Sequence, residues 1–231
     1  MAKQVYAYDN NTNDFKLMGA RQWRSQITNT GATNYLRSHL KQSVINDFSV
    51  ASSAYISDSQ NTQVGKGFFA LLRILFPTIT FLGTLYKGKD YSTNAIAFMN
   101  RYLGRVNPKY RKVSDIIYNV YRHGLMHTQM PKMVKIGTRL TGWSITYNTS
   151  DHLRVRTLGT NALISICPQR LYEDLLRAIE FFITDINNAR LQGVRMRYFK
   201  QGFVSMAEVF TEKDKSLKSS PRGVRYIKSL P

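Results

Sequence analysis

Acidic side chains are scarce in this sequence. Its 231 residues include 14 Asp and Glu against 33 Lys and Arg, which gives a formal net charge of +19. A compact fold with this much like charge repels itself, so the excess favours an anionic partner. Nucleic acid is the first candidate, because each phosphate that a cation neutralises releases counterions and adds affinity. An anionic membrane surface and a basic surface that serves only solubility are the alternatives.

Cysteine is almost absent as well. Cys167 is the only one, so the chain can form no intrachain disulfide, no cysteine-rich zinc site and no CxxC redox pair. Because Cys167 stands beside Pro168 at the end of an apolar stretch, we expect an inert core thiol rather than a nucleophile. The first thirty residues lack the apolar core of a signal peptide. These features predict a cytoplasmic protein.

Three common motifs of nucleotide-binding proteins and hydrolases are missing. The sequence has no GxxxxGK[ST] phosphate loop, no GxGxxG fingerprint and no GxSxG elbow. Nucleotide hydrolysis and serine hydrolase chemistry therefore have no support, and we expect no cofactor and no bound metal. The carboxylates of Glu173, Asp174 and Glu180 are expected to form an exposed acidic face of a helix.

Only one apolar run approaches the length of a membrane span. It extends from 68 to 86, between Lys66 and Lys87. Arg73 lies inside the run, and a central arginine costs roughly 2.5 kcal/mol or more in lipid. We therefore expect a buried core helix, with a kink or break at Pro77, and no membrane partner.

Helical periodicity predicts four further helices. Apolar residues recur every four positions from Leu36 to Phe48, after candidate caps at Thr33 and Asn34, which predicts a helix over 34–54. The remaining helices are predicted over 92–103, from 108 to Pro131, and over 168–190.

Between 133 and 166 the sequence pattern changes from helical periodicity to an alternation of apolar and polar residues, as from Trp143 to Tyr147. Turn residues are found at Gly142 and at Asn148 to Asp151. This pattern predicts a small antiparallel β-meander. The expected fold class is therefore mainly α: a helical bundle with the β-meander inserted before the last long helix.

The domain organisation follows from these elements. We expect an N-terminal arm or hairpin over 1–32 and a helical domain over 33–190. A basic C-terminal extension should follow over 191–231, polar and without apolar periodicity from Thr211 onward.

Two stretches carry much of the positive charge. Nine Lys or Arg stand between 101 and 139 against Asp115 alone, and ten stand between 190 and 231 against three acids. The candidate nucleic-acid contacts in these stretches are Lys109, Arg111, Lys112, Lys132, Lys135, Arg195, Arg197 and Lys200. Tyr198, Phe199 and Phe203 could offer base-stacking platforms, although aromatic residues are more often core.

One short motif could carry chemistry. The helix from 108 leads into Arg122-His123-Gly124-Leu125-Met126-His127. A guanidinium can grip phosphate oxygens with two hydrogen bonds, and an imidazole can transfer protons near neutral pH. On a straight helix, however, five residues turn about 500°, which leaves Arg122 and His127 roughly 140° apart.

Two other interpretations of this motif stay open. His123 and His127 are four positions apart, which is the spacing of a two-histidine metal site on a helix. Alternatively, Arg122 and both histidines only cap carbonyls in the last helical turn.

The motif resembles that of the HEPN superfamily, helical-bundle proteins whose ribonucleases carry Arg, a polar residue, variable positions and His. His123 fills the polar slot. The resemblance implies a metal-independent endoribonuclease that acts as a homodimer, with catalytic Arg122, His127 and His123 at a shared cleft. It also implies cytoplasmic roles in bacterial defence or toxin systems, with an antitoxin or another regulatory partner.

Two rivals to this interpretation are kept. The chain could be a non-catalytic RNA- or DNA-binding protein that uses the same cations. It could also be an interaction module of a larger nucleoprotein assembly that docks through the apolar 68–86 segment.

Overall fold

A computed structural model describes residues 3–9, 12, 14–59, 68–125 and 131–209, apart from the side chains of 54–59, 68 and 123. The chain divides into two compact units. The large unit is formed by 28–203, and the small unit combines the two ends of the chain, 1–27 and 204–231.

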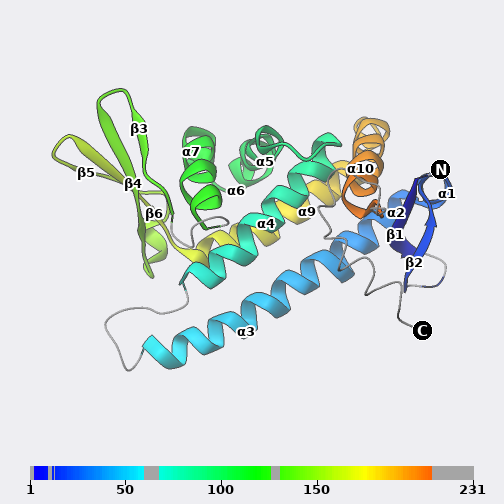
Figure 1. Cartoon of the computed structure of the whole chain (residues 1–231), viewed down its shortest axis with the longest axis horizontal. Helices are drawn as coiled ribbons and strands as arrows, with labels where there is room; N and C mark the ends of the chain where they lie inside the picture. Colours follow the sequence, from blue (N-terminus) through cyan, green and yellow to red (C-terminus); the bar gives the residue numbers. More distant parts are fainter. Residues whose placement is uncertain (1–2, 10–11, 13, 60–67, 126–130, 210–231) are drawn as a thin grey trace, which may run out of the picture. The chain divides into compact units, whose positions relative to one another are not determined.

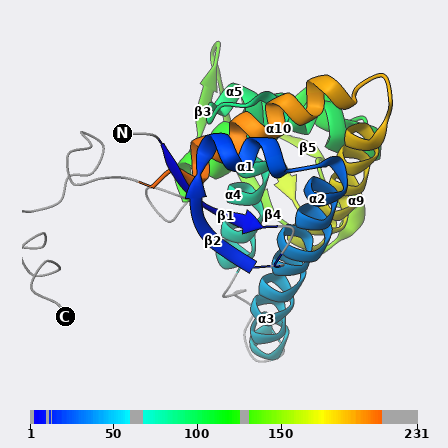
Figure 2. The same cartoon turned by 90° about the vertical axis from the view of Figure 1, so that its right-hand side faces the viewer.

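The small unit contains the hairpin that the sequence predicted. Strands β1 (Gln4–Asp9) and β2 (Asp14–Gly19) pair antiparallel, and helix α1 (Ala20–Gln26) packs against them (Figure 2). The indole N–H of Trp23 donates to the Tyr8 carbonyl at 3.1 Å. The other end of the chain closes the unit, because Glu208 forms a β-bridge with Val5 and an ion pair of 2.7 Å with Lys3.

The large unit begins with a helical run that is longer than predicted. It consists of α2 (Asn29–Asn34), the π-helical η1 (Tyr35–Lys41) and α3 (Gln42–Ser59). The Thr28 hydroxyl caps its first turn by accepting from the N–H of Gly31 at 3.1 Å. The predicted caps at Thr33 and Asn34 are therefore wrong, because the helix has already begun there.

Helix α4 (Phe68–Lys87) is the apolar segment, and it forms the centre of the large unit (Figure 1). Its length and composition would allow it to span a membrane over Phe69–Lys87, yet 56% of that stretch is buried inside the fold. The segment is therefore compatible with a soluble protein. The helix is also continuous through Pro77, so no break occurs there.

A second helical run crosses α4 and then turns back. Its elements are α5 (Ser92–Phe98), the π-helical η2 (Met99–Leu103), α6 (Gly104–Val106), α7 (Tyr110–Ile117) and the π-helical η3 (Tyr118–His123). The helix predicted over 92–103 is confirmed, although Gly104 lies inside the run rather than ending it. Rings from three helices form the core here, where Tyr86, Tyr102 and Phe182 contact one another.

The strands of the large unit form one mixed sheet instead of the predicted antiparallel meander. Strands β3 (Val134–Ile136), β4 (Arg139–Ile145), β5 (Val155–Leu158) and β6 (Asn161–Ile166) are arranged in the order β3-β4-β6-β5. Pairs β3–β4 and β5–β6 are antiparallel hairpins, whereas β4 and β6 pair in parallel. The prediction is therefore wrong for the central pair.

Each hairpin turns through a Gly-Thr pair. Gly137 and Gly159 have φ of 60° and 58°, as the first residue of a two-residue type II′ turn requires. Since β4 and β6 run in parallel, both turns lie at the same end of the sheet. Gly142, which the sequence indicated as a turn, instead lies inside β4 opposite Leu163.

Two helices follow the sheet. Helix α9 (Pro168–Asn187) begins with proline in its first turn, as predicted. It is not the last long helix, because α10 (Gln192–Ala207) follows it within the stretch predicted as a basic extension. Buried Phe199 stacks with Phe203, which shows that this stretch contributes to the core. The predicted extended tail from Thr211 lies outside the described residues.

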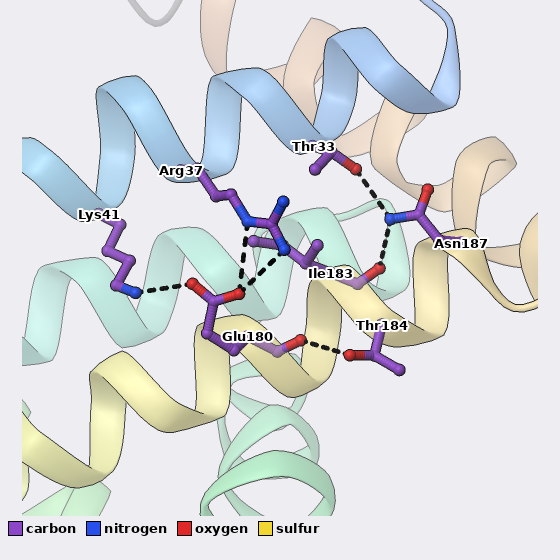
Figure 3. Close-up of polar contacts among 7 residues, drawn as sticks. All are labelled: Thr33, Arg37, Lys41, Glu180, Ile183, Thr184 and Asn187. Atoms are coloured by element: carbon purple, nitrogen blue, oxygen red, sulfur yellow. Dashed lines mark hydrogen bonds and ion pairs between the residues drawn. The ribbon is translucent and has the colours of Figure 1, made fainter.

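One acidic side chain fastens α9 to η1 (Figure 3). Glu180 accepts from Lys41 at 2.6 Å and from Arg37 at 3.3 Å. Two turns further along α9, the Asn187 amide donates to the hydroxyl of Thr33 at 3.1 Å. Although partial burial acts to raise the pKa of Glu180, its hydrogen bonds and the charges of both cations lower that pKa on balance.

Candidate nucleic-acid interface

Arg122 lies in a widened helical turn. Helix α7 continues into η3, a π-helical turn that includes Arg122 and ends at His123. The Arg122 side chain is half-buried, and its guanidinium lies over the Tyr118 ring at 5.8 Å. π-helical turns pair residue i with i+5 and are frequent at functional sites. The side chain of His123 and the whole of His127 lie outside the described residues.

Tyr121 fixes this turn to the sheet. Its hydroxyl lies 2.9 Å from the carbonyl oxygens of both Ser144 on β4 and Ile164 on β6. Its ring stacks on Phe76 of α4 with centroids 5.9 Å apart. Burial raises the pKa of Tyr121 far above its ordinary value, so the hydroxyl keeps its proton and acts as a donor. The residue next to Arg122 therefore joins η3 to the two central strands.

The chain returns to the same turn at Lys132. The backbone N–H of Lys132 donates to the Val120 carbonyl at 2.7 Å. The Lys132 side chain is exposed, as is that of Lys135 on β3. Of the predicted contact residues, Lys132 therefore lies where the chain enters the sheet, and Lys135 lies on its first strand.

The start of α7 presents three further predicted contacts. Lys109, Arg111 and Lys112 are all exposed. The Asn107 side chain accepts from the Lys109 N–H at 3.1 Å, which helps to begin the helix. Among the residues that the structure describes, none of these three cations forms an ion pair, and neither does Arg122.

The three predicted contacts on α10 belong to another region. The guanidinium of Arg195 lies 4.4 Å from the centre of the Tyr86 ring. The guanidinium of Arg197 lies 5.2 Å from the centre of the Tyr198 ring. Lys200 is half-buried. Figure 1 shows α10 at the far end of α4 from the sheet and α7. Phe199 and Phe203 are buried, so the prediction that they offer base-stacking platforms is wrong.

A buried polar network was missed by the sequence analysis. The Tyr110 hydroxyl lies 2.7 Å from Nε2 of His152 and donates to Oδ2 of Asp174 at 3.2 Å. The N–H of Cys167 donates to Nδ1 of His152 at 3.1 Å, and Arg170 Nε lies 3.1 Å from Oδ1 of Asp174. These contacts join α7, α9 and both ends of the β5–β6 hairpin.

The protonation of the network follows from its geometry. Burial first, and then the charges of Arg170 and Lys109, lower the pKa of His152 to about 3, so the ring is neutral. Because Nδ1 accepts from a backbone N–H, the proton resides on Nε2 and is donated to the Tyr110 oxygen. Burial also raises the pKa of Asp174, against the opposing effects of Arg170 and the Tyr110 hydrogen bond.

Asp174 is fully buried, so the prediction that it belongs to an exposed acidic face is wrong. Its position between Leu171 and Leu175, on the buried stripe of α9, was the signal that could have revealed it. Since Tyr110, His152 and Asp174 are buried and bonded to one another, the network holds the start of α7 in place rather than offering a reactive group to solvent.

No family model matches the chain, and comparison with curated proteins and with solved structures also gives no match. The function is therefore inferred from the residues of this chain. Within the described part of the chain, no group of three or more His, Cys, Asp or Glu side chains could hold a metal ion.

Proposed function

We propose that this protein is a metal-independent endoribonuclease that uses Arg122 and His127 as its catalytic pair, with His123 beside them. The observation that carries the proposal is the setting of Arg122. Its half-buried guanidinium lies in a π-helical turn, without an acidic partner among the described residues, at the end of a helix whose start presents three exposed cations.

The widened turn also bears on the geometry of the motif. Arg122 and His127 are separated by five positions, which is the interval that a π-helical turn pairs. Since η3 extends into the motif, the separation of about 140° expected for a straight α-helix does not apply unchanged.

The proposed chemistry requires only proton transfer and charge stabilisation. The ribose 2′-OH loses its proton to a base and attacks the adjacent phosphorus, while the 5′-oxygen of the next nucleotide leaves and gains a proton. The His127 imidazole serves in proton transfer, and Arg122 stabilises the doubly charged phosphorane with paired hydrogen bonds. The products carry a 2′,3′-cyclic phosphate and a 5′-hydroxyl.

We extend the proposal to the setting of the enzyme. Two copies complete the cleft, the chain acts in the cytoplasm, and an antitoxin or another regulatory partner controls it. These statements depend on the resemblance of Arg122-His123-Gly-Leu-Met-His127 to the HEPN motif.

A cleavage assay in EDTA tests the enzyme directly. Wild type, Arg122→Ala, Arg122→Lys and His127→Ala are incubated with single-stranded and structured RNA. We expect full cutting by wild type, with cyclic phosphate ends, and none by Arg122→Ala or His127→Ala. Cutting by Arg122→Lys should be weak, because lysine keeps the charge but loses the planar fork. Arg177→Ala, at an exposed arginine of α9, is the matched control and should cut like wild type.

A second candidate function is non-catalytic binding of RNA or DNA. The exposed cations at the start of α7, which have no ion-pair partner in the described part of the chain, favour it equally, because phosphate contacts need no catalytic pair. If wild type and all variants bind RNA but none of them cuts it, this function is supported and the enzyme is refuted. Cutting that requires a divalent metal refutes the proposed mechanism. The interaction-module alternative has less support, because most apolar side chains of α4 are buried within the unit.

A further inference from the structure

The four-stranded sheet has an inner face against the helices. Trp143 packs edge-on against Phe69 of α4 with centroids 5.6 Å apart, and Ile164 and Ile166 are buried on the same face. Because side chains alternate along a strand, their sequence neighbours belong to the opposite face. We call this the outer face and define it by Met133, Lys135, Leu140, Arg156, Leu158 and Leu163.

The centre of the outer face is a shallow apolar floor. A Cβ placed on Gly142 would lie 3.0 Å from both the Met133 Cε and the Leu163 Cδ2, so these two side chains close over the glycine from either side. Leu163 is half-buried, while Met133 is 51% and Leu158 is 59% exposed. The floor therefore offers apolar contact area to solvent.

Cations stand at both edges of this floor. Lys135 lies on edge strand β3 opposite Leu140, and Arg156 lies on edge strand β5 opposite Leu163. Strands are about 4.8 Å apart, so the two edges are separated by roughly 14 Å. Asp151 is the single acid between 131 and 172, and it holds Arg156 at 2.6 Å. Lys135 and Arg156 outnumber this carboxylate, so the two edges carry a net positive charge.

The outer face begins beside the Arg122 turn. Lys132, whose backbone is bonded to Val120 of that turn, directly precedes Met133. Tyr121 holds the two central strands to the same turn. Along the chain, the outer face therefore follows directly after the residue whose backbone contacts the Arg122 turn.

We propose that the outer face binds a single-stranded segment of RNA next to the Arg122 turn, an inference that rests on the proposed function. Phosphates pair with Lys135 and Arg156 at the edges. Unpaired bases lie on the apolar floor and against the Arg156 guanidinium plane, which suits any sequence. A duplex fits this surface less well, because its bases are stacked inside and only its backbone could approach the floor.

Binding is measured on the full chain with a labelled 2′-O-methyl single-stranded oligonucleotide, which has no free 2′-OH and cannot be cut. The double variant Lys135→Gln, Arg156→Gln should lose roughly tenfold in affinity, at about threefold for each lost phosphate contact. The slope of log affinity against log salt should become shallower by about 1.4. An unchanged affinity and slope overturn the proposal.

Arg139→Gln is the matched control. Arg139 is an exposed cation of the same hairpin, but its register opposite Ile136 assigns it to the inner face. Its affinity should stay within about twofold of wild type, because no phosphate contact is lost. Far-UV circular dichroism and thermal unfolding confirm that each variant is folded, and a loss in Arg139→Gln equal to that of the double variant refutes a face-specific site.

Met133→Gln tests the floor. It keeps the length of the side chain but makes it polar, so binding of the single strand should weaken several-fold while binding of a 2′-O-methyl duplex of equal length stays the same. Equal losses for both probes refute the single-strand assignment. Because neither probe can be cut, a failure of the ribonuclease proposal in the cleavage assay leaves these results interpretable.

Discussion

The phenol oxygen of Tyr110 and the imidazole Nε2 of His152 lie 2.7 Å apart, inside the large unit. This hydrogen bond connects the first residue of α7 to the segment just before β5. The helix that presents Lys109, Arg111 and Lys112 is therefore tied to the sheet by a neutral histidine.

Loss of the Tyr110 hydroxyl should destabilise the fold. Tyr110→Phe leaves the Nε2 proton of His152 and Oδ2 of Asp174 without this partner in a buried site, which costs about 1–3 kcal/mol. Urea unfolding measures the change in the free energy of unfolding. Tyr91→Phe, at an exposed tyrosine, is the control and should change it by less than about 0.5 kcal/mol. Equal effects at both positions would contradict the role of the network.

His152 should make the fold sensitive to acid. Burial lowers its pKa from an ordinary value of 6.5 to about 3 in the folded chain, so between these values the unfolded chain binds a proton that the folded chain does not. The free energy of unfolding should therefore fall as pH falls from about 6.5 towards 3, by at most about 1.4 kcal/mol per pH unit from this group. Above about pH 6.5 it contributes no slope.

His152→Gln tests this pH dependence, because an amide can accept and donate but does not titrate here. Chemical unfolding at a series of pH values should give a shallower acid slope than wild type. An identical slope in the variant would assign the acid sensitivity to other groups.

Helix packing should not tolerate a methyl group at Gly83. A Cβ there would lie 2.5 Å from the Ala95 backbone, where α4 crosses α5. Gly83→Ala should therefore lower the free energy of unfolding by roughly 1–3 kcal/mol or more, since backbone must move to make room.

Gly193→Ala should have the opposite effect on stability to Gly83→Ala. Nothing lies within 4 Å of a Cβ at this exposed helical position. The substitution should stabilise by about 0.4–1 kcal/mol, because it restricts the unfolded chain. Thermal unfolding of both variants measures the contrast, and a loss of stability in Gly193→Ala would contradict it.

The ion pairs of Glu180 should add a modest, salt-sensitive increment to the free energy of unfolding. Glu180→Gln removes the charge that Lys41 and Arg37 share, and for a half-exposed site the loss should be at most about 1 kcal/mol and smaller in high salt. Since the folded-state pKa is lowered, this contribution is present at neutral pH and disappears as pH falls through that pKa. Urea unfolding at two salt concentrations measures it, with Asp47→Asn as an exposed control on α3.

The local parts of the fold were predictable from the sequence. The periodicity of 168–190 and Pro168 at the first helical position predicted α9, because both signals act within a few residues. The parallel pairing of β4 with β6 was not predictable in this way, since alternation looks the same whichever way a neighbouring strand runs. The Gly-Thr turns at Gly137 and Gly159 were readable signals that were missed.

The candidate site was predictable only in part. The motif at Arg122 stood out through its charge and its place at a helix end, but a 3.6-residue period cannot reveal a π-helical turn. The contacts of Tyr121 with Ser144 and Ile164 join segments about 20 and 40 positions away, and no local pattern specifies them. These long-range contacts are what bring the motif, Lys132 and the sheet together.

The bridge between Val5 and Glu208 makes the small unit depend on the order of synthesis. More than two hundred residues must be translated between these partners, which at 5–20 residues per second takes roughly ten to forty seconds. Throughout that interval the nascent N-terminal hairpin lacks the segment that completes it, and it must stay unaggregated on the ribosome. Strand β1 is therefore among the last of the described strands to find its full set of neighbours.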